Sequence, residues 1–212
     1  MKENKYDDNI FFQKYSQMSR SQQGLAGAGE WETLRKLLPD FKDKRVLDLG
    51  CGYGWHCIYA MEHGASSVVG VDISHKMLEV AKEKTHFPQV EYKCCAIEDV
   101  EFPEESFDVI LSSLAFHYVA DYEILVKKIY RILKSGGKLV FTVEHPVFTA
   151  YGTQDWHYNE KGEILHFPVD NYYYEGKRTA VFLGEKVTKY HRTLTTYLNT
   201  LLSNCLLYTS PS

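Results

Sequence analysis

The 212-residue chain lacks any apolar run close to the roughly 18 residues that a membrane-spanning helix needs. It also lacks an excess of positive charge, since 24 Lys and Arg stand against 28 Asp and Glu. The basic surface of a nucleic-acid-binding protein and a polybasic membrane patch are therefore both missing. Residues 1–8 are polar and charged and show no signal peptide, so we expect a cytoplasmic protein that binds neither nucleic acid nor membrane.

The five cysteines form no CxxC pair, and an odd number cannot all be joined in disulfides. This pattern argues against a zinc site and against a disulfide framework. We therefore expect reduced thiols, mostly buried as small core residues, and no metal.

Strands and helices are predicted to alternate through the middle of the chain, after two short amphipathic helices near residues 11–18 and 31–38. A loop rich in Gly, Ser and Gln separates those two helices. Strands are expected at residues 45–49, 67–71, 90–94, 107–112 and 138–143. Right-handed crossovers between them predict an α/β fold, a doubly wound, Rossmann-like and mostly parallel sheet with helices on both faces. Ligands of such sheets bind at the carboxyl ends of the strands.

The alternation ends near residue 146, and residues 147–192 are rich in Tyr, Trp and His. We expect this segment to be an insertion over the sheet that contains a β-hairpin. Its strands are predicted at residues 169–174 and 179–191, around Glu175-Gly176-Lys177. Residues 193–202 return to a helical pattern.

The most informative segment runs from Val46 to Gly54 and reads as a buried strand followed by a turn with three alternating glycines. Glycine accepts positive φ and lets the backbone approach a ligand closely, and the N–H groups of the following helix N-terminus face that ligand. The dinucleotide fingerprint GxGxxG does not match this spacing. A P-loop is excluded because no G-K-[ST] follows.

The pattern D-x-G-x-G-x-G at residues 48–54, with Asp72 ending the next strand, resembles the class I S-adenosylmethionine-dependent methyltransferases. Three later segments resemble the same family in the same order, at residues 101–108, 114–119 and 131–139. The resemblance covers about residues 10–145. Within the family, the chain resembles the methyltransferase domains that act on small molecules. It implies S-adenosylmethionine as cofactor and methyl transfer by direct displacement at the sulfonium methyl.

The resemblance also implies a set of cofactor-binding residues. Loop N–H groups would approach the methionyl part, with Asp48 either anchoring the loop or meeting the ammonium group. Asp72 would accept both ribose hydroxyls, and Ile73 and Met77 would sandwich the adenine. Many family members carry Asp where this chain has Ala96, so the adenine edge is expected to be read nearby. The predicted set is Tyr15, Arg20, Asp48, Gly50, Cys51, Gly52, Gly54, Asp72, Ile73, Met77, Ala96, Ile97, Glu98 and Ser113.

Two histidines are candidate catalytic bases, His117 and His145, because imidazole titrates near neutral pH. The alternatives are a His117 that packs under the cofactor and a His145 that is structural. A base is needed only for an oxygen or carbon acceptor. The aromatic insertion indicates a small, partly apolar acceptor, with a protein acceptor as the alternative that stays open, as does the oligomeric state. Two other functions remain open, a non-catalytic cofactor- or nucleotide-binding module and an NAD-linked oxidoreductase.

The chain is predicted to divide into four segments. Residues 1–44 form an N-terminal helical cap, 45–146 the cofactor-binding core, 147–192 the substrate-side insertion, and 193–212 a helix with an atypical, truncated tail. Similar proteins add two more strands after such a helix. We therefore expect five parallel strands, with the last antiparallel hairpin missing, and a fifth strand that is an exposed, destabilising edge.

Overall fold

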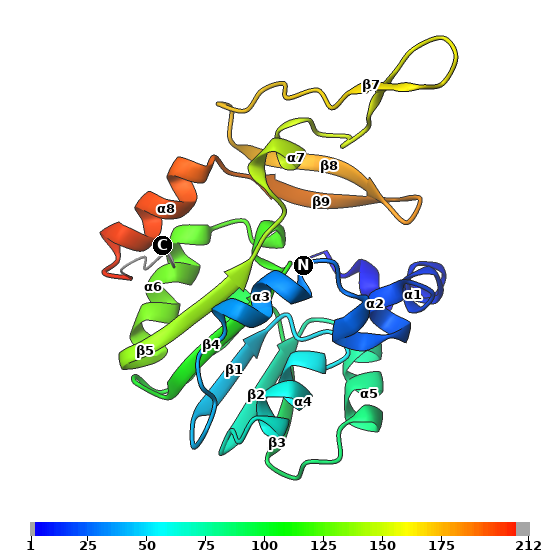
Figure 1. Ribbon diagram of the computed structural model, residues 1–212. Helices are drawn as coiled ribbons and strands as arrows, with labels where there is room; N and C mark the ends of the chain where they lie inside the picture. Colours follow the sequence, from blue (N-terminus) through cyan, green and yellow to red (C-terminus); the bar gives the residue numbers. More distant parts are fainter. Residues whose placement is uncertain (1–2, 207–212) are drawn as a thin grey trace.

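Five parallel strands form the central sheet in the order β3-β2-β1-β4-β5 (Figure 1). The computed structural model describes residues 3–206, so the last six residues of the predicted tail lie outside the described part. The five predicted parallel strands are confirmed, and β5 has no further strand beside it within residues 3–206. The strands are β1 (Arg45–Leu49), β2 (Ser67–Asp72), β3 (Val90–Cys94), β4 (Phe107–Ser113) and β5 (Leu133–Thr142).

Helices cover both faces of this sheet, as predicted, because neighbouring strand residues point to opposite sides. Val46 packs in a cluster with residues of α4 (Trp55–Glu62) and α5 (His75–Lys84). Leu47 and Leu49 pack in a second cluster with α6 (Tyr122–Ile132) and α8 (Leu194–Ser203). The near-continuous apolar strands therefore follow from burial on both sides. Among the described residues, no helix is both long and apolar enough to cross a bilayer.

Strand β5 starts at Leu133, earlier than the predicted residue 138, directly after α6. Its pairing with β4 shifts register between Phe107 and Val109. Gly136, with a φ of 73°, lies in this irregularity inside the strand.

The N-terminal region contains η1 (Lys5–Asp7), α1 (Asn9–Ser16), α2 (Ser19–Gln22), η2 (Gly24–Gly27) and α3 (Trp31–Leu37). The prediction of a loop between α1 and α3 was wrong, since α2 and η2 lie there. Each is a single short turn, too short for apolar periodicity to be read. Ser21 Oγ donates a hydrogen bond of 2.7 Å to the Tyr15 carbonyl and ties α2 to α1.

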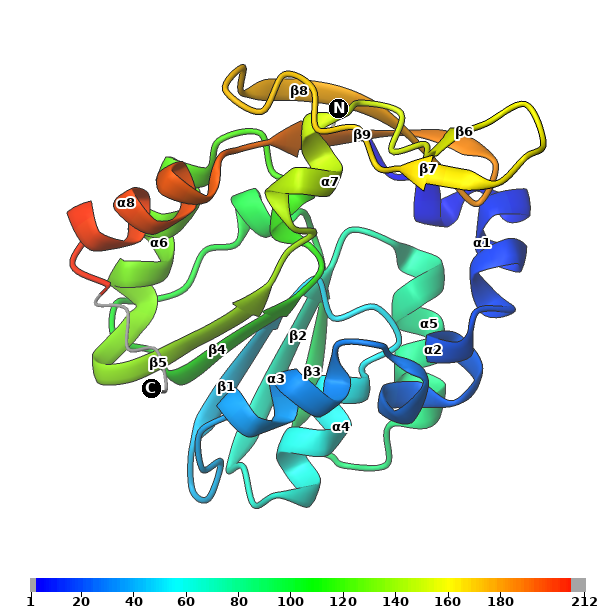
Figure 2. The same cartoon turned by 45° about the horizontal axis from the view of Figure 1, so that its top comes forward.

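The insertion contains α7 (Pro146–Ala150), β6 (His157–Tyr158), β7 (Ile164–His166), β8 (Gly176–Phe182) and β9 (Glu185–His191). Strands β8 and β9 form a hairpin that extends over the carboxyl ends of the sheet (Figures 1 and 2). An insertion hairpin is confirmed, but the predicted turn at Glu175-Gly176-Lys177 is wrong. The chain turns at Leu183-Gly184, where both residues have positive φ, 55° and 79°. A two-residue turn with positive φ fits the twist of the paired strands. Such turns usually begin with Asn, Asp or Gly, so the leucine in the first position gave no indication of a turn.

Candidate active site

A cavity of 530 Å³ lies at the carboxyl ends of the strands, and residues of the β8–β9 hairpin form part of its wall. Its volume falls within the roughly 300–1,000 Å³ of small-molecule sites. Its walls come from segments far apart in the chain, among them η1, the glycine loop, η3 (Ile97–Asp99), η4 (Phe116–Tyr118) and β9. The predicted site residues that line it are Tyr15, Arg20, Gly50, Gly52, Asp72, Ile73, Met77, Ala96, Ile97, Glu98, Ser113 and His117. The others, Asp48, Cys51, Gly54 and His145, do not line it.

The three glycines of the loop all have positive φ, 80° at Gly50, 52° at Gly52 and 75° at Gly54. A Cβ on Gly50 would lie 2.5 Å from the Ala115 Cβ, and one on Gly54 would lie 2.2 Å from the Tyr92 hydroxyl oxygen. Gly52 has no atom within 4 Å of that position, and it lines the cavity. Gly50 and Gly54 are thus required by packing, whereas Gly52 leaves its surface open to a ligand.

Several N–H groups of this loop are bonded within the protein. Gly50 and Cys51 donate to the Val71 carbonyl at 2.8 and 2.9 Å, and Gly52 donates to Asp72 Oδ2 at 2.9 Å. That loop N–H groups meet the cofactor stays a prediction, and these three N–H groups already have partners within the protein. The loop lets a ligand come close to its backbone at Gly52, and the N–H groups named above stabilise the turn.

Asp48 lies beneath the loop, with an exposed fraction of 1%. Its Oδ2 accepts a hydrogen bond from Cys57 Sγ at 3.5 Å, and its Oδ1 has no hydrogen-bond partner. Burial raises the pKa of Asp48 to about 7, and the nearby Asp72 carboxylate adds to the effect. Of the two predicted roles, this position favours anchoring the loop over meeting a ligand.

Asp72 lines the cavity with its carboxylate held from two sides. Its Oδ1 accepts from Ser74 N and its Oδ2 from Gly52 N, both at 2.9 Å. Burial raises the pKa of Asp72, while these backbone bonds oppose the shift. Each oxygen keeps a lone pair for another donor, because a carboxylate has about four acceptor sites.

Residues 3–9, here called the N-terminal strap, cross from the sheet to the hairpin beside the cavity. Asp7 Oδ1 accepts from Ser74 Oγ at 2.6 Å, and Asn4 Nδ2 donates to the Ile73 carbonyl at 3.1 Å. On the other side, Glu3 Oε1 accepts from Thr188 N of β9 at 3.2 Å. Sequence reasoning missed the strap, because its partners are far away along the chain.

Further cavity residues were missed for the same reason. Glu30 forms an ion pair with Arg20 and accepts from Ser113 Oγ at 3.0 Å, so it joins two predicted residues. Tyr6 contacts Tyr15 and Tyr118 edge-to-face, at ring distances of 5.4 and 6.4 Å. The aromatic content of the N-terminal helices was the available signal for such a wall.

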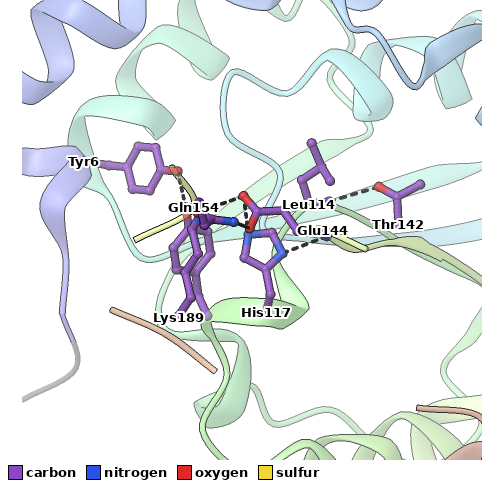
Figure 3. A network of polar contacts seen from close by, with 8 residues as sticks. Tyr6, Leu114, His117, Thr142, Glu144, Gln154 and Lys189 are labelled. Atoms are coloured by element: carbon purple, nitrogen blue, oxygen red, sulfur yellow. Dashed lines mark hydrogen bonds and ion pairs between the residues drawn. The ribbon is translucent and has the colours of Figure 1, made fainter. Parts of the chain in front are cut away.

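A partly buried polar network lies at another wall of the cavity (Figure 3). Lys189 Nζ of β9 bonds to Glu144 Oε1 and, at 2.9 Å, to Gln154 Oε1. Gln154 Nε2 donates to Glu144 Oε2 at 2.9 Å. The backbone N–H of Glu144 donates to His117 Nδ1 at 3.4 Å, and His117 Nε2 lies 3.9 Å from Glu144 Oε1. Glu144 lines the cavity beside His117.

The two candidate histidines have different surroundings. Burial lowers the pKa of His117 to about 4, with Lys189 and Arg192 lowering it further and Glu144 opposing them, so the ring is neutral at pH 7. His145 does not line the cavity, and its Nδ1 accepts from Val147 N at 3.2 Å as the N-cap of α7. The prediction of His145 as a catalytic base is corrected to a capping role, because the chain turns into α7 at this residue.

Comparison with known proteins supports one family. The profile of a methyltransferase domain matches residues 47–141. A Listeria monocytogenes crystal structure, assigned as an S-adenosylmethionine-dependent methyltransferase, is 58% identical and covers 83% of each chain with a TM-score of 0.80. The chain belongs to this methyltransferase family. An S-adenosylmethionine-dependent methyltransferase structure from Mesorhizobium loti is 41% identical, with a TM-score of 0.79, over 86% of this chain and 83% of that one.

One curated relative is a methyltransferase whose name states that it methylates oxygen. The ubiquinone biosynthesis O-methyltransferase of Coxiella burnetii is 36% identical over 112 residues, 52% of this chain and 47% of that protein. The chain thus spans about half the length of that relative. These comparisons confirm the predicted family, fold class and enzyme activity, and S-adenosylmethionine as the cofactor. They do not identify the acceptor.

Proposed function

We propose that this methyltransferase acts on a small-molecule acceptor that binds in the same cavity as the cofactor. The observation that carries the proposal is the cover over the cavity, where the N-terminal strap and β9 meet above the strand ends. Aromatic side chains from this cover and from η4 line the space, namely Tyr6, Tyr118, Phe182 and Tyr190. Such a wall suits a small, partly apolar acceptor.

The residues present fit S-adenosylmethionine. Gly52 offers an open backbone surface, and the Asp72 carboxylate is held in place with lone pairs left for two ribose hydroxyls. Ile73 and Met77 follow Asp72 along the wall and are proposed to contact the adenine, whose edge Ala96, Ile97 and Glu98 would read. When bound, the cofactor supplies an activated methyl group.

The chain's own contribution to the reaction is proposed to be mainly alignment and exclusion of water. Tyr15 and Arg20 line the cavity near the glycine loop, and the strap covers the start of α5. Holding two reactants in one orientation is a large part of the rate that a displacement reaction gains. Family membership argues against the NAD-linked oxidoreductase and the non-catalytic module. The four-segment division of the chain and its cytoplasmic location stay predictions.

A labelling experiment tests the acceptor class. The purified protein is incubated with methyl-labelled S-adenosylmethionine and a cell extract that has been split into a small-molecule and a macromolecular fraction. We expect label to be transferred only in the small-molecule fraction, and to be lost with Asp72→Asn, which removes the charge on the proposed ribose contact. Transfer only to protein or nucleic acid would contradict the proposal.

A further inference from the structure

The polar network in the cavity wall points to a preference for one chemical group. We infer that Glu144 and His117 together select an acceptor that carries a hydroxyl group, with Lys189 and Gln154 as positioning residues. The inference rests on the proposed function, because the acceptor has to enter this cavity. It adds the chemistry of the nucleophile, so that the product would be an O-methyl compound. The hydroxyl oxygen would bond to the methyl group as the bond between that methyl and the sulfonium sulfur breaks, leaving S-adenosylhomocysteine, and the hydroxyl proton would pass to the Glu144 carboxylate.

The spacing between Glu144 and His117 leaves room for one further atom. Glu144 Oε1 and His117 Nε2 are 3.9 Å apart, too far for a hydrogen bond with each other, and both residues line the cavity (Figure 3). An oxygen atom can lie about 2.8 Å from both at once, which is an ordinary hydrogen-bond distance. The pair therefore forms a two-point site for a single oxygen.

The protonation of His117 determines what the two points offer. The backbone N–H of Glu144 can only donate, so His117 Nδ1 must accept, and the neutral ring then carries its proton on Nε2. The carboxylate is an acceptor and Nε2–H is a donor. A hydroxyl group satisfies both, because it donates one hydrogen bond and accepts another.

Other nucleophiles match this site less well. An alkyl amine is protonated near neutral pH, and in this form it has three donors and no acceptor, so it cannot pair with Nε2–H until it loses a proton. Two buried cations also lie behind the site, Lys189 with 3% and Arg192 with 6% of its surface exposed. Arg192 is held by the Val119 and Ala120 carbonyls, which keep its charge in place without neutralising it. A thiol is only a weak hydrogen-bond donor.

The Glu144 side chain is held in the orientation that this site needs. Lys189 bonds to one carboxylate oxygen and Gln154 to the other, and Gln154 also accepts from Lys189. Lys189 belongs to β9 and Gln154 to the segment after α7, so the insertion sets the position of a residue at the end of the sheet. Each oxygen keeps acceptor capacity for a substrate hydroxyl.

Binding of simple probes tests the inference without turnover. The full chain, labelled with ¹⁵N-histidine and saturated with S-adenosylhomocysteine, is titrated with phenol, benzylamine and toluene. We expect phenol to shift the His117 Nε2 resonance, and Glu144→Gln to weaken phenol binding at least five-fold while S-adenosylhomocysteine affinity stays unchanged. Glu101→Gln is the matched control, since Glu101 is an exposed surface carboxylate that does not line the cavity.

Several results would overturn the inference. These are a toluene or benzylamine shift equal to that of phenol, no phenol shift at all, or unchanged phenol affinity in Glu144→Gln. If Glu144→Gln does not fold, by far-UV circular dichroism, Gln154→Ala replaces it, because it releases one carboxylate oxygen and leaves the ion pair intact. We expect a two- to three-fold loss of phenol affinity there, and no loss would also overturn the inference.

The labelling experiment separates this inference from the function on which it rests. With ¹³C-methyl S-adenosylmethionine, the carbon chemical shift of the product distinguishes O-methyl from N-, S- and C-methyl groups. An O-methyl small molecule supports the inference. An N-, S- or C-methyl small molecule overturns it and leaves the proposed function intact, whereas label in macromolecules contradicts the proposed function itself.

Discussion

At the residue scale, Gly50 and Gly52 share a backbone conformation but have different surroundings. Gly50→Ala adds a Cβ 2.5 Å from Ala115 Cβ, whereas Gly52→Ala adds one into open space, and both carry the cost of positive φ. We expect Gly52→Ala to lose about 1 kcal/mol of stability from strain and most of its S-adenosylhomocysteine affinity. Gly50→Ala should lose more stability. Urea unfolding measures the stability and calorimetric titration the affinity, and equal destabilisation of the two variants would show that the Ala115 contact does not restrict position 50.

Asp48 predicts a pH-dependent stability. Its folded pKa of about 7 lies above the ordinary 3.8, so between these values the folded chain holds a proton that the unfolded chain releases. Its contribution therefore falls as pH rises through this window, by up to about 1.4 kcal/mol per pH unit. We expect Asp48→Asn to gain stability relative to wild type between pH 5 and pH 7, measured by urea unfolding. The exposed Asp155→Asn is the control, and a gain that is independent of pH would contradict the argument.

At the element scale, two neighbouring aspartates of the strap have different roles. Asp8 caps α1 by accepting from Ile10 N and Phe11 N, whereas Asp7 accepts from Ser74 Oγ and Lys76 N at the start of α5. We expect Asp7→Ala and Asp8→Ala each to cost about 1 kcal/mol of unfolding free energy. Only Asp7→Ala should also speed release of S-adenosylhomocysteine, because it detaches the strap from the sheet.

Stopped-flow displacement measures that release rate, and urea unfolding supplies the stability of both variants. A release rate that Asp7→Ala leaves unchanged would show that the strap does not cover the bound cofactor. A faster rate in both would point to general loosening of the N-terminal region.

Elements were predictable where their signals are local. Strand β1 follows from its own run of apolar residues, and the start of α5 is marked by Ser74, whose Oγ accepts from Met77 N at 3.1 Å. The β8–β9 turn was not predictable, because positive φ at Leu183 is imposed by the twist of the paired strands. The start of β5 was also missed, since Leu133 pairs with Phe107 of β4 before the irregularity that contains Gly136.

At the scale of the whole molecule, cofactor binding should stabilise the fold. S-adenosylhomocysteine at 100 times its dissociation constant adds about 2.7 kcal/mol to the unfolding free energy. For a chain of this size, we expect the melting temperature to rise by roughly 5–10 °C. NAD at the same concentration should leave it unchanged. A thermal melt with each ligand measures this, and a rise with NAD alone would contradict the assignment of the cavity.

The sequence predicted the floor of the candidate site better than its cover. Gly52, Asp72 and Ile97 lie in ordered motifs whose spacing is set by strand–turn–helix geometry. Glu30 and Lys189 reach the cavity only through contacts between distant segments, so local patterns carry no sign of them. Asp48 is found easily by its motif, but the sequence does not show that it is buried beneath the loop, because that burial depends on packing against α4.

The cavity walls also bear on the order in which the chain folds. Tyr6, Gly52, His117 and Tyr190 meet around one space, although they span most of the sequence. Contacts at such separation pay loop-closure entropy and form slowly compared with local ones. The strand–helix units can therefore form before the cavity exists, and competence to bind ligand should appear in the final phase of refolding, after most secondary structure has returned.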